Sequence, residues 1–156
     1  MPSAKCGFVD IPGGHPAANL LVQWGPTILV DIGFDPKFTF VPGGPSPVPG
    51  LTGLDALVDT GATESCIDSL LAAQLNLPVV DRRMTAGAHG SKEVNVHLAQ
   101  VRVPSLGFTI YGAFAGVDLR AGGQAHSALI GRTFLRHFKM IYEGTTGNVE
   151  IIGPNP

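Results

Sequence analysis

One aspartate stands at the end of an apolar strand in residues 56–63, which read Ala-Leu-Val-Asp-Thr-Gly-Ala-Thr. Leu57 and Val58 predict a rigid, buried strand, and Gly61 lets the following chain fold back beneath Asp59 without a Cβ in the way. Backbone N–H groups in such a turn can bind the ionised carboxylate of Asp59, which could then act as a base. The tripeptide alone is weak evidence for a site, because Asp, Thr and Gly are also ordinary turn residues.

A second apolar strand meets a glycine in residues 128–135, which read Ala-Leu-Ile-Gly-Arg-Thr-Phe-Leu. Together the two segments resemble the retropepsin family of aspartic proteases. In that family a strand ending in Asp-Thr-Gly-Ala precedes a flap hairpin, and a second strand ending in Ile-Gly-Arg then leads into a short helix. The resemblance runs from about Ile28 to about Ile152. It implies an all-β fold, a closed barrel-like sheet with one or two short helices, active as a twofold homodimer.

The resemblance implies peptide-bond hydrolysis by two carboxylates about 3 Å apart that share one proton. One carboxylate acts as a base toward water while the protonated one polarises the scissile carbonyl. The chain supplies one convincing aspartate. Asp31 also follows an apolar strand, but the next residue, Ile32, has no hydroxyl and no second Ile-Gly-Arg accompanies it. The simplest solution is a homodimer in which the Asp59 residues of two subunits meet across the twofold axis.

The resemblance also assigns roles around Asp59, the catalytic residue. Thr60 would donate its hydroxyl across the twofold axis, and Gly61 would approach the substrate backbone. Ala62 and Thr63 would line the cleft. Three further residues would lie beneath the turn. Ile130 would be part of the substrate site, and Gly131 and Arg132 would support the turn structurally.

One position departs from the viral members of the family. They usually carry an aspartate two residues after the Asp-Thr-Gly, facing the arginine of Gly-Arg, whereas this chain has Thr63 there. Arg132 therefore lacks the expected acidic partner, and Glu64 is the nearest substitute. A cellular or bacterial member fits this pattern better than a viral one.

Residues 86–92 predict the tip of a hairpin where the flap of the family would lie. Gly87 and Gly90 give its backbone freedom to open and to close over substrate. The substrate contacts expected there are Ala88, His89 and Gly90, although an exposed loop histidine such as His89 is often inert.

Length and composition predict a single globular domain over residues 19–156, after an N-terminal segment, residues 1–18. That segment could be a dimer arm, a removable pro-segment or disordered. The chain is 44% hydrophobic and only 14% charged, which predicts a surface with few polar side chains. Such a surface favours a partner that covers some of the apolar area. The net charge of −2 argues against binding to nucleic acid or to an anionic membrane.

Residues 1–7 lack the apolar core of a signal peptide, and no stretch reaches the roughly 18 apolar residues of a membrane span, so a cytoplasmic protein is expected. The cysteines and histidines lack metal-ligand spacing, and we expect neither a metal nor a cofactor. We expect Cys66 to be a small, apolar packing residue inside a helix, although the sequence also allows a disulfide between Cys66 and Cys6.

The remaining pattern is mostly short strands with turn signals between them. Residues 19–24 and 27–32 predict two strands joined at Gly25-Pro26, with residues 38–41 extending the second. Residues 42–53, rich in Pro and Gly, predict an exposed loop, either simply mobile or a binding arm. A helix is expected over residues 65–75, followed by strands that close the barrel. Those strands include residues 108–116 and a final hairpin of residues 139–142 and 149–152.

This pattern has three possible interpretations. The first is a homodimeric aspartic endopeptidase that acts on extended peptides or proteins. The second is a module of the same fold that binds a peptide or dimerises without cleaving. The third is an unrelated β-barrel with a coincidental turn, which the order and spacing of the two segments argue against. The intact Asp59-Thr60-Gly61 favours cleavage over the second.

Overall fold

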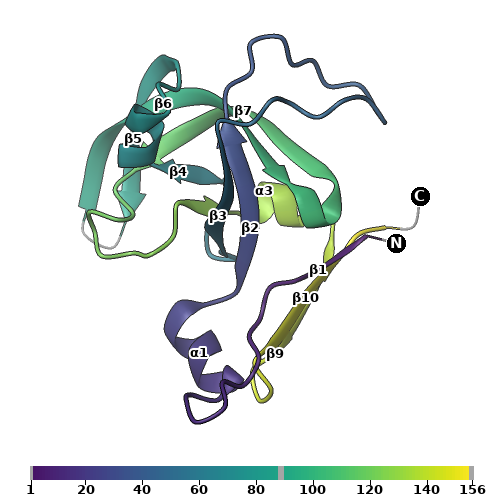
Figure 1. Cartoon of the computed structure of the whole chain (residues 1–156). Helices are drawn as coiled ribbons and strands as arrows, with labels where there is room; N and C mark the ends of the chain where they lie inside the picture. The colour runs from purple at the N-terminus through teal and green to yellow at the C-terminus, as the bar shows by residue number, and fades with distance from the viewer. Residues whose placement is uncertain (1, 88–89, 155–156) are drawn as a thin grey trace.

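The computed structural model describes residues 2–87 and 90–154, and most of its strands form one closed barrel (Figure 1). Seven strands hydrogen-bond in the order β2-β3-β8-β4-β7-β6-β5, and a further pairing of β2 with β6 closes the barrel, leaving β5 outside it. The strands of this sheet are β2 (Thr27–Gly33), β3 (Leu51–Val58), β4 (Cys66–Asp68), β5 (Val79–Gly87), β6 (Gly90–Val103), β7 (Phe108–Val117) and β8 (Ala128–Ile130). The predicted fold class is confirmed, while the homodimer stays a prediction.

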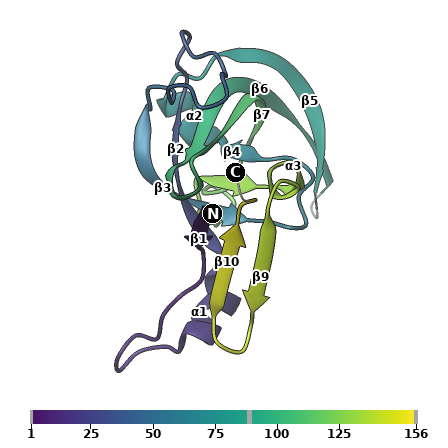
Figure 2. The same ribbon diagram turned by 90° about the vertical axis from the view of Figure 1, so that its right-hand side faces the viewer.

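A second sheet lies below the barrel and has the order β1-β10-β9 (Figure 2). It contains β1 (Ser3–Lys5), β9 (Lys139–Glu143) and β10 (Asn148–Ile152). The predicted final hairpin is therefore present, but it was wrongly assigned to the barrel. Within the first eighteen residues, Ser3–Lys5 pair with β10, and Cys6, which follows them, is fully inaccessible to solvent.

The barrel interior is filled by β-branched and other apolar side chains from facing strands. Val30 and Ile32 of β2, Val103 of β6 and Ile130 of β8 are each 0% exposed. The alternation along β2 explains this arrangement, because Ile28, Val30 and Ile32 face inward while Leu29 faces solvent. The same core fixes the end of β3, from which Asp59 projects.

The helices are short: α1 (Ala17–Trp24), α2 (Ser69–Gln74), α3 (Arg132–Leu135) and a 3-10 turn over Pro104–Leu106. The strand predicted over residues 19–24 was wrong, since these residues belong to α1. Ala17, Leu20 and Leu21 lie at helical spacing and are buried on one face. Gly25 ends the helix with φ 73° and donates its N–H to the Leu21 carbonyl oxygen, so Gly25-Pro26 connects a helix to a strand.

The helix predicted over residues 65–75 begins later than expected. Residues 66–68 form β4, because they pair with both β7 and β8 inside the barrel. The buried Asp68 then caps α2 by accepting a hydrogen bond from Leu71 N at 3.3 Å. Cys66 consequently lies in a strand rather than in a helix.

Both cysteines are free thiols, and no disulfide joins them. Burial raises the pKa of the Cys6 thiol to about 12 and that of Cys66 to about 11. Both therefore stay protonated at neutral pH.

The chain between β2 and β3 is a long loop over residues 34–50. Residues 38–41 were expected to extend β2, but they belong to this loop instead. The loop also ends earlier than the predicted boundary at residue 53, because Leu51 already pairs with Ile32 at the start of β3.

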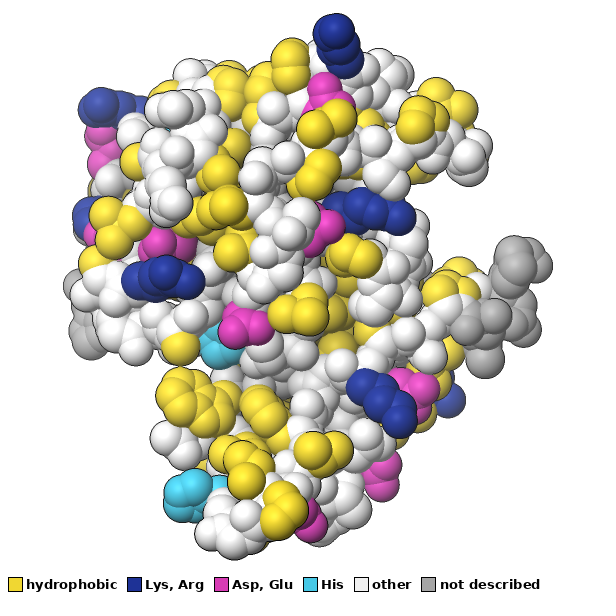
Figure 3. Space-filling view, viewed as in Figure 1, with side chains coloured by type: hydrophobic (Ala, Val, Ile, Leu, Met, Phe, Trp, Pro, Cys, Tyr) yellow, Lys and Arg dark blue, Asp and Glu magenta, His cyan; other side chains and the backbone are white. Residues whose placement is uncertain are grey.

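The lower lobe, formed by α1 and the chain before it, gathers hydrophobic side chains on the face shown in Figure 3. In these segments Val22 is 84% exposed and Val9 is 81% exposed. These exposed apolar side chains agree with the low content of charged residues in the composition.

Candidate active site

Asp59 begins a tight turn directly after the last residue of β3. The strand places it, because the Val58 side chain is buried at 3% exposure while the Asp59 side chain is half-buried. Gly61 N donates a hydrogen bond to Asp59 Oδ1 at 2.9 Å, and Ala62 N donates to the Asp59 carbonyl oxygen at 3.2 Å. The turn therefore holds the carboxylate with a backbone amide, and the other carboxylate oxygen, Oδ2, accepts no bond from the described residues.

The two segments singled out in the sequence lie side by side. β3 and β8 pair in parallel, with Leu57 opposite Leu129 and Val58 opposite Ile130. Asp59 N then donates to the Ile130 carbonyl oxygen at 2.9 Å. Because the strands run in the same direction and end together, Asp59 and Gly131 leave the sheet at the same edge.

Gly131 lies where the backbone of the Asp59 turn crosses it. A Cβ at this position would stand 2.6 Å from the Glu64 carbonyl oxygen and 2.9 Å from that of Ala62. Gly131 N also donates to Ser65 Oγ at 3.1 Å. Its φ of −96° is open to any residue, so the need for glycine here is steric.

Arg132 ties α3 to the same turn. Its guanidinium donates to the Thr60 carbonyl oxygen at 2.8 Å and to Thr63 Oγ1 at 3.1 Å. The backbone N–H of Arg132 donates to the Ala62 carbonyl oxygen at 2.9 Å, and that of Thr133 to the Thr63 carbonyl oxygen at 3.0 Å. The turn is thus fixed by both the side chain and the backbone of the first residues of α3.

The sequence suggested Glu64 as a substitute for the missing acidic partner of Arg132, but Glu64 does not take that place. It instead forms an ion pair with Arg83 of β5 at 3.2 Å. Thr63, two residues after Gly61, still binds Arg132. Its hydroxyl oxygen accepts a hydrogen bond from the guanidinium that a carboxylate at this position would have bound.

The predicted hairpin tip joins β5 to β6, with Ala86 opposite Ser91 and Gly87 opposite Gly90. Gly90 has φ 102°, a conformation that side-chain-bearing residues rarely adopt. Ala88 and His89 lie outside the described residues. The hairpin is confirmed, and its role over a bound substrate stays a prediction.

Asp31, the second aspartate with a superficially similar pattern, lies within β2 and not in a turn. It accepts a hydrogen bond from Gly53 N at 3.0 Å.

The sequence did not predict Ser65 as a supporting residue. Its hydroxyl oxygen accepts a hydrogen bond from a glycine amide 66 residues away, and such a contact leaves no local signal in the sequence.

Residues 2–87 and 90–154 contain no cluster of His, Cys, Asp or Glu side chains that could hold a metal ion. In the same residues, no helix is long and apolar enough to cross a bilayer.

Comparison with known proteins gives a family for this arrangement. Residues 50–137, which carry both the Asp59 turn and the Gly131 segment, match the family described as "gag-polyprotein putative aspartyl protease". A search of curated proteins found no match. Among solved structures, the chain is similar to EIAV protease complexed with the inhibitor HBY-793, with 19% identity and a TM-score of 0.47. That alignment covers 71% of this chain and 85% of the other. The family match extends over more than half of the chain and includes the aspartate turn with its supporting strand, so the chain belongs to the retropepsin-like aspartic protease family.

Proposed function

We propose that the protein is a homodimeric aspartic endopeptidase that hydrolyses peptide bonds with a water held between two Asp59 carboxylates, one from each subunit. The observation that carries the proposal is the Asp59 turn. Its carboxylate is bound by Gly61 N, and its backbone is fixed by Ile130 and Arg132. A carboxylate placed this rigidly suits proton transfer to and from a substrate.

In the proposed reaction the ionised Asp59 takes a proton from the water as the water oxygen attacks the scissile carbonyl carbon. The protonated Asp59 of the other subunit gives its proton to the carbonyl oxygen, so a neutral tetrahedral diol forms. Collapse of the diol breaks the C–N bond. The departing nitrogen takes a proton from one carboxyl group, and the other carboxyl recovers one from the diol, so the pair again shares a single proton.

For the neighbouring residues we propose the roles that the resemblance implies. Thr60 would link the two turns across the twofold axis, and Gly61 would let the substrate backbone come close. The substrate would lie against Ala62, Thr63 and Ile130, beneath a flap that includes Ala88, His89 and Gly90. Gly131 and Arg132 would support the turn from below.

The dimer is supported by the free edge of the lower sheet. β9 hydrogen-bonds to β10 alone among the described strands, and its other edge is open on the side where α3 lies (Figure 2). Two copies of β9 pairing antiparallel about Ile141 would set Lys139 opposite Glu143 of the partner subunit. Both side chains are exposed, and opposite charges facing each other favour such a pairing. An unpaired edge with this self-complementary charge pattern suits a twofold contact.

The experiment compares wild-type protein with Asp59→Asn and Asp31→Asn on a diverse peptide library, with products read by mass spectrometry. Asn keeps the shape of the side chain but cannot share the proton. We expect Asp59→Asn to lose hydrolysis while its far-UV circular dichroism stays unchanged. Asp31→Asn is the matched control, because it makes the same chemical change in the other Asp-x-Gly, and it should keep activity. Cleavage by Asp59→Asn at the wild-type rate would refute the assignment.

If the wild-type protein cleaves nothing but binds peptides, the non-catalytic module of the same fold is the correct function. Equilibrium binding of labelled library peptides to wild type and to Asp59→Asn separates this outcome from an inactive preparation. Equal binding by the two proteins with no product would identify the module.

A further inference from the structure

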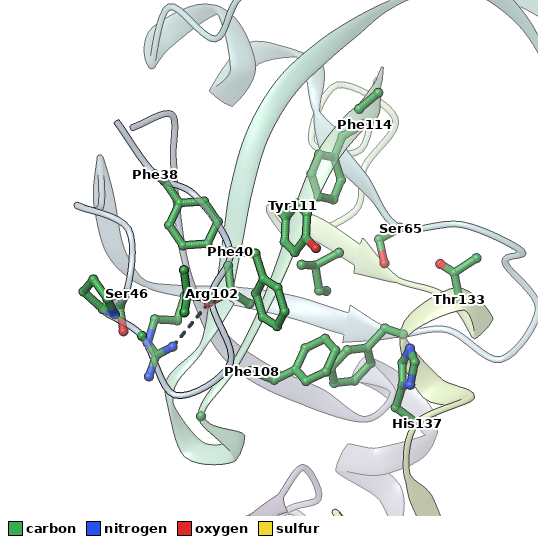
Figure 4. A pocket seen from close by; sticks show the side chains of 18 of the residues that line it. Phe38, Phe40, Ser46, Ser65, Arg102, Phe108, Tyr111, Phe114, Thr133 and His137 are labelled. Atoms are coloured by element: carbon green, nitrogen blue, oxygen red, sulfur yellow. Dashed lines mark hydrogen bonds between the residues drawn. The ribbon is translucent and has the colours of Figure 1, made fainter. Parts of the chain in front are cut away.

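A cavity of about 780 Å³ lies between the long loop over residues 34–50, strand β7 and helix α3, and Asp59 is not among the residues that line it (Figure 4). Its walls are largely aromatic. Phe38 and Phe40 come from the loop, Phe108 and Tyr111 from β7, and Phe134 from α3. We call this cavity the aromatic pocket. Its volume lies in the range of cavities that bind organic ligands or large side chains.

The loop that forms the outer wall is held at its base. The Asp35 carboxylate accepts hydrogen bonds from Lys37 N and Val48 N, both at 3.0 Å, which lowers the pKa of Asp35. The buried Gln100 binds the Asp35 backbone twice, accepting from its N–H at 2.7 Å and donating to its carbonyl oxygen at 3.1 Å. The two ends of the loop are therefore tied to each other and to β6.

The loop is also fixed against β7 by aromatic contacts. The ring of Phe40 stacks on Tyr111 with centroids 5.4 Å apart, and Phe38 meets the same ring edge-on at 5.8 Å. Phe40 is nevertheless 53% exposed and Tyr111 52% exposed. Keeping two aromatic rings half in water is unfavourable, and a ligand in the pocket would remove that cost.

The aromatic pocket shares a wall with the active-site turn. Glu64 and Ser65, which line it, directly follow Thr63 along the chain. Ser65 is 6% exposed, and its hydroxyl oxygen binds Gly131 N. Thr133 also lines the pocket, while its backbone N–H binds the Thr63 carbonyl oxygen. A chain leaving the cleft past Thr63 would thus meet the pocket within a few residues.

We propose that the aromatic pocket is a second substrate-binding site, which takes an aromatic or large aliphatic side chain of the polypeptide substrate several residues away from the scissile bond. The inference rests on the proposed function. The shared wall favours the substrate over an unconnected small molecule. Two charged residues in the lining, Arg102 and Glu64, can bind the polar backbone of the same peptide. Preferred substrates would then carry an apolar cluster outside the cleaved sequence.

The first experiment uses fluorogenic peptides built on one core sequence that the wild-type protein cleaves. The core is extended at either end, through Gly-Ser spacers of increasing length, by Phe-Leu-Phe or by Ser-Gly-Ser. We expect kcat/KM to rise about tenfold for Phe-Leu-Phe at one end and one spacer length, chiefly through KM. No gain at either end for any spacer would overturn the proposal.

Two variants locate the gain. Ala113→Trp fills the aromatic pocket from β7, and Ala73→Trp makes the same change at an exposed position of α2 outside it. The ratio of kcat/KM for the Phe-Leu-Phe peptide to that for the core should fall to about one in Ala113→Trp and stay high in Ala73→Trp. Persistence of the gain in Ala113→Trp would contradict the assignment.

A binding measurement keeps the test independent of hydrolysis. Fluorescein-labelled Gly-Ser-Gly-Phe-Leu-Phe-Gly-Ser-Gly is titrated with Asp59→Asn protein and followed by fluorescence anisotropy. Binding that is lost in the Asp59→Asn/Ala113→Trp double variant supports the pocket even if wild-type protein cleaves nothing. Equal binding by both proteins, or none by either, counts against the pocket whatever the fate of the protease assignment.

Discussion

Arg132 donates a hydrogen bond from its guanidinium to the carbonyl oxygen of Thr60 at 2.8 Å, joining α3 to the turn that carries Asp59. The same side chain binds Thr63 Oγ1. One planar group therefore clamps two points of the turn, a geometry that a lysine cannot reproduce.

This clamp predicts that Arg132→Lys impairs catalysis more than folding. The charge is kept, but only one of the two acceptors can be reached, so the turn loses its fixed geometry. We expect kcat/KM to fall about tenfold or more and the melting temperature to fall by only a few degrees. Arg136→Lys, at the exposed end of α3, is the control and should match wild type. A kinetic loss no larger in Arg132→Lys than in Arg136→Lys would show that the clamp does not support catalysis.

Gly131→Ala should destabilise the fold. The added methyl would stand 2.6 Å from the Glu64 carbonyl oxygen, and this contact is with backbone that cannot rotate away. We expect a loss of about 2 kcal/mol in the free energy of unfolding, measured by urea denaturation. Gly144→Ala makes the same change where the nearest atom lies 3.5 Å away, and it should cost no more than about 0.5 kcal/mol. Equal losses in the two variants would show that crowding beneath the turn is not the cause.

How far the sequence predicts this site depends on whether a contact is local or long-range. Asp59, Gly61 and the Gly131 segment could be assigned because strand, turn and glycine follow one another along the chain. The acceptors of Arg132 could not, since a backbone carbonyl such as that of Thr60 carries no residue signature. The aromatic pocket was missed for a similar reason, because Phe38 and Phe40 were expected in a strand and their contact with Tyr111 joins segments distant in sequence.

The error at α1 has a different origin. Leu20, Leu21 and Val22 form a short apolar run, and such a run fits a buried strand as well as a helix turn. The decision falls to tertiary packing, which buries Ala17, Leu20 and Leu21 on one helical face. Strand β7 was easier to predict from residues 108–116, because it is long and rich in β-branched and aromatic residues.

The free edge of β9 predicts a charge-swap experiment on the dimer. Lys139→Glu places two acidic side chains opposite each other in each half of the proposed pairing, so the dimer dissociation constant should rise several-fold. The double variant Lys139→Glu/Glu143→Lys restores opposite charges and should recover most of the affinity. Sedimentation equilibrium measures both, with Lys37→Glu on the exposed loop as a charge-matched control. Failure of the double variant to recover affinity would exclude this pairing of β9.

His126 predicts how stability depends on pH. Burial lowers the pKa of His126 below its ordinary value of 6.5, with a smaller opposing effect from Asp55. Nε2 of His126 forms a hydrogen bond with Thr27 Oγ1 at 2.9 Å. Nδ1, the other ring nitrogen, is buried without a partner among the described residues. The folded state therefore resists protonation.

Because the folded-state pKa of His126 is lowered, the unfolded chain binds a proton first as the pH falls. The contribution of His126 to stability is retained above pH 6.5 and is lost as the pH drops from 6.5 toward the lower folded-state pKa. His126→Gln keeps a group that can hydrogen-bond to Thr27 but does not titrate, so the free energy of unfolding of this variant should fall less over this range. Urea denaturation at several pH values checks this, with the exposed His15→Gln as control. Parallel pH profiles for wild type and His126→Gln would disprove the role of His126.

In the proposed dimer, one active site needs Asp59 from two subunits. Wild-type and Asp59→Asn chains, unfolded together in known ratios and refolded, form dimers at random. If both carboxylates are needed, activity per total protein follows the square of the wild-type fraction, so an equal mixture keeps about one quarter of the activity. Activity that falls linearly, to about one half in the equal mixture, would show that each chain works alone and would contradict the shared site.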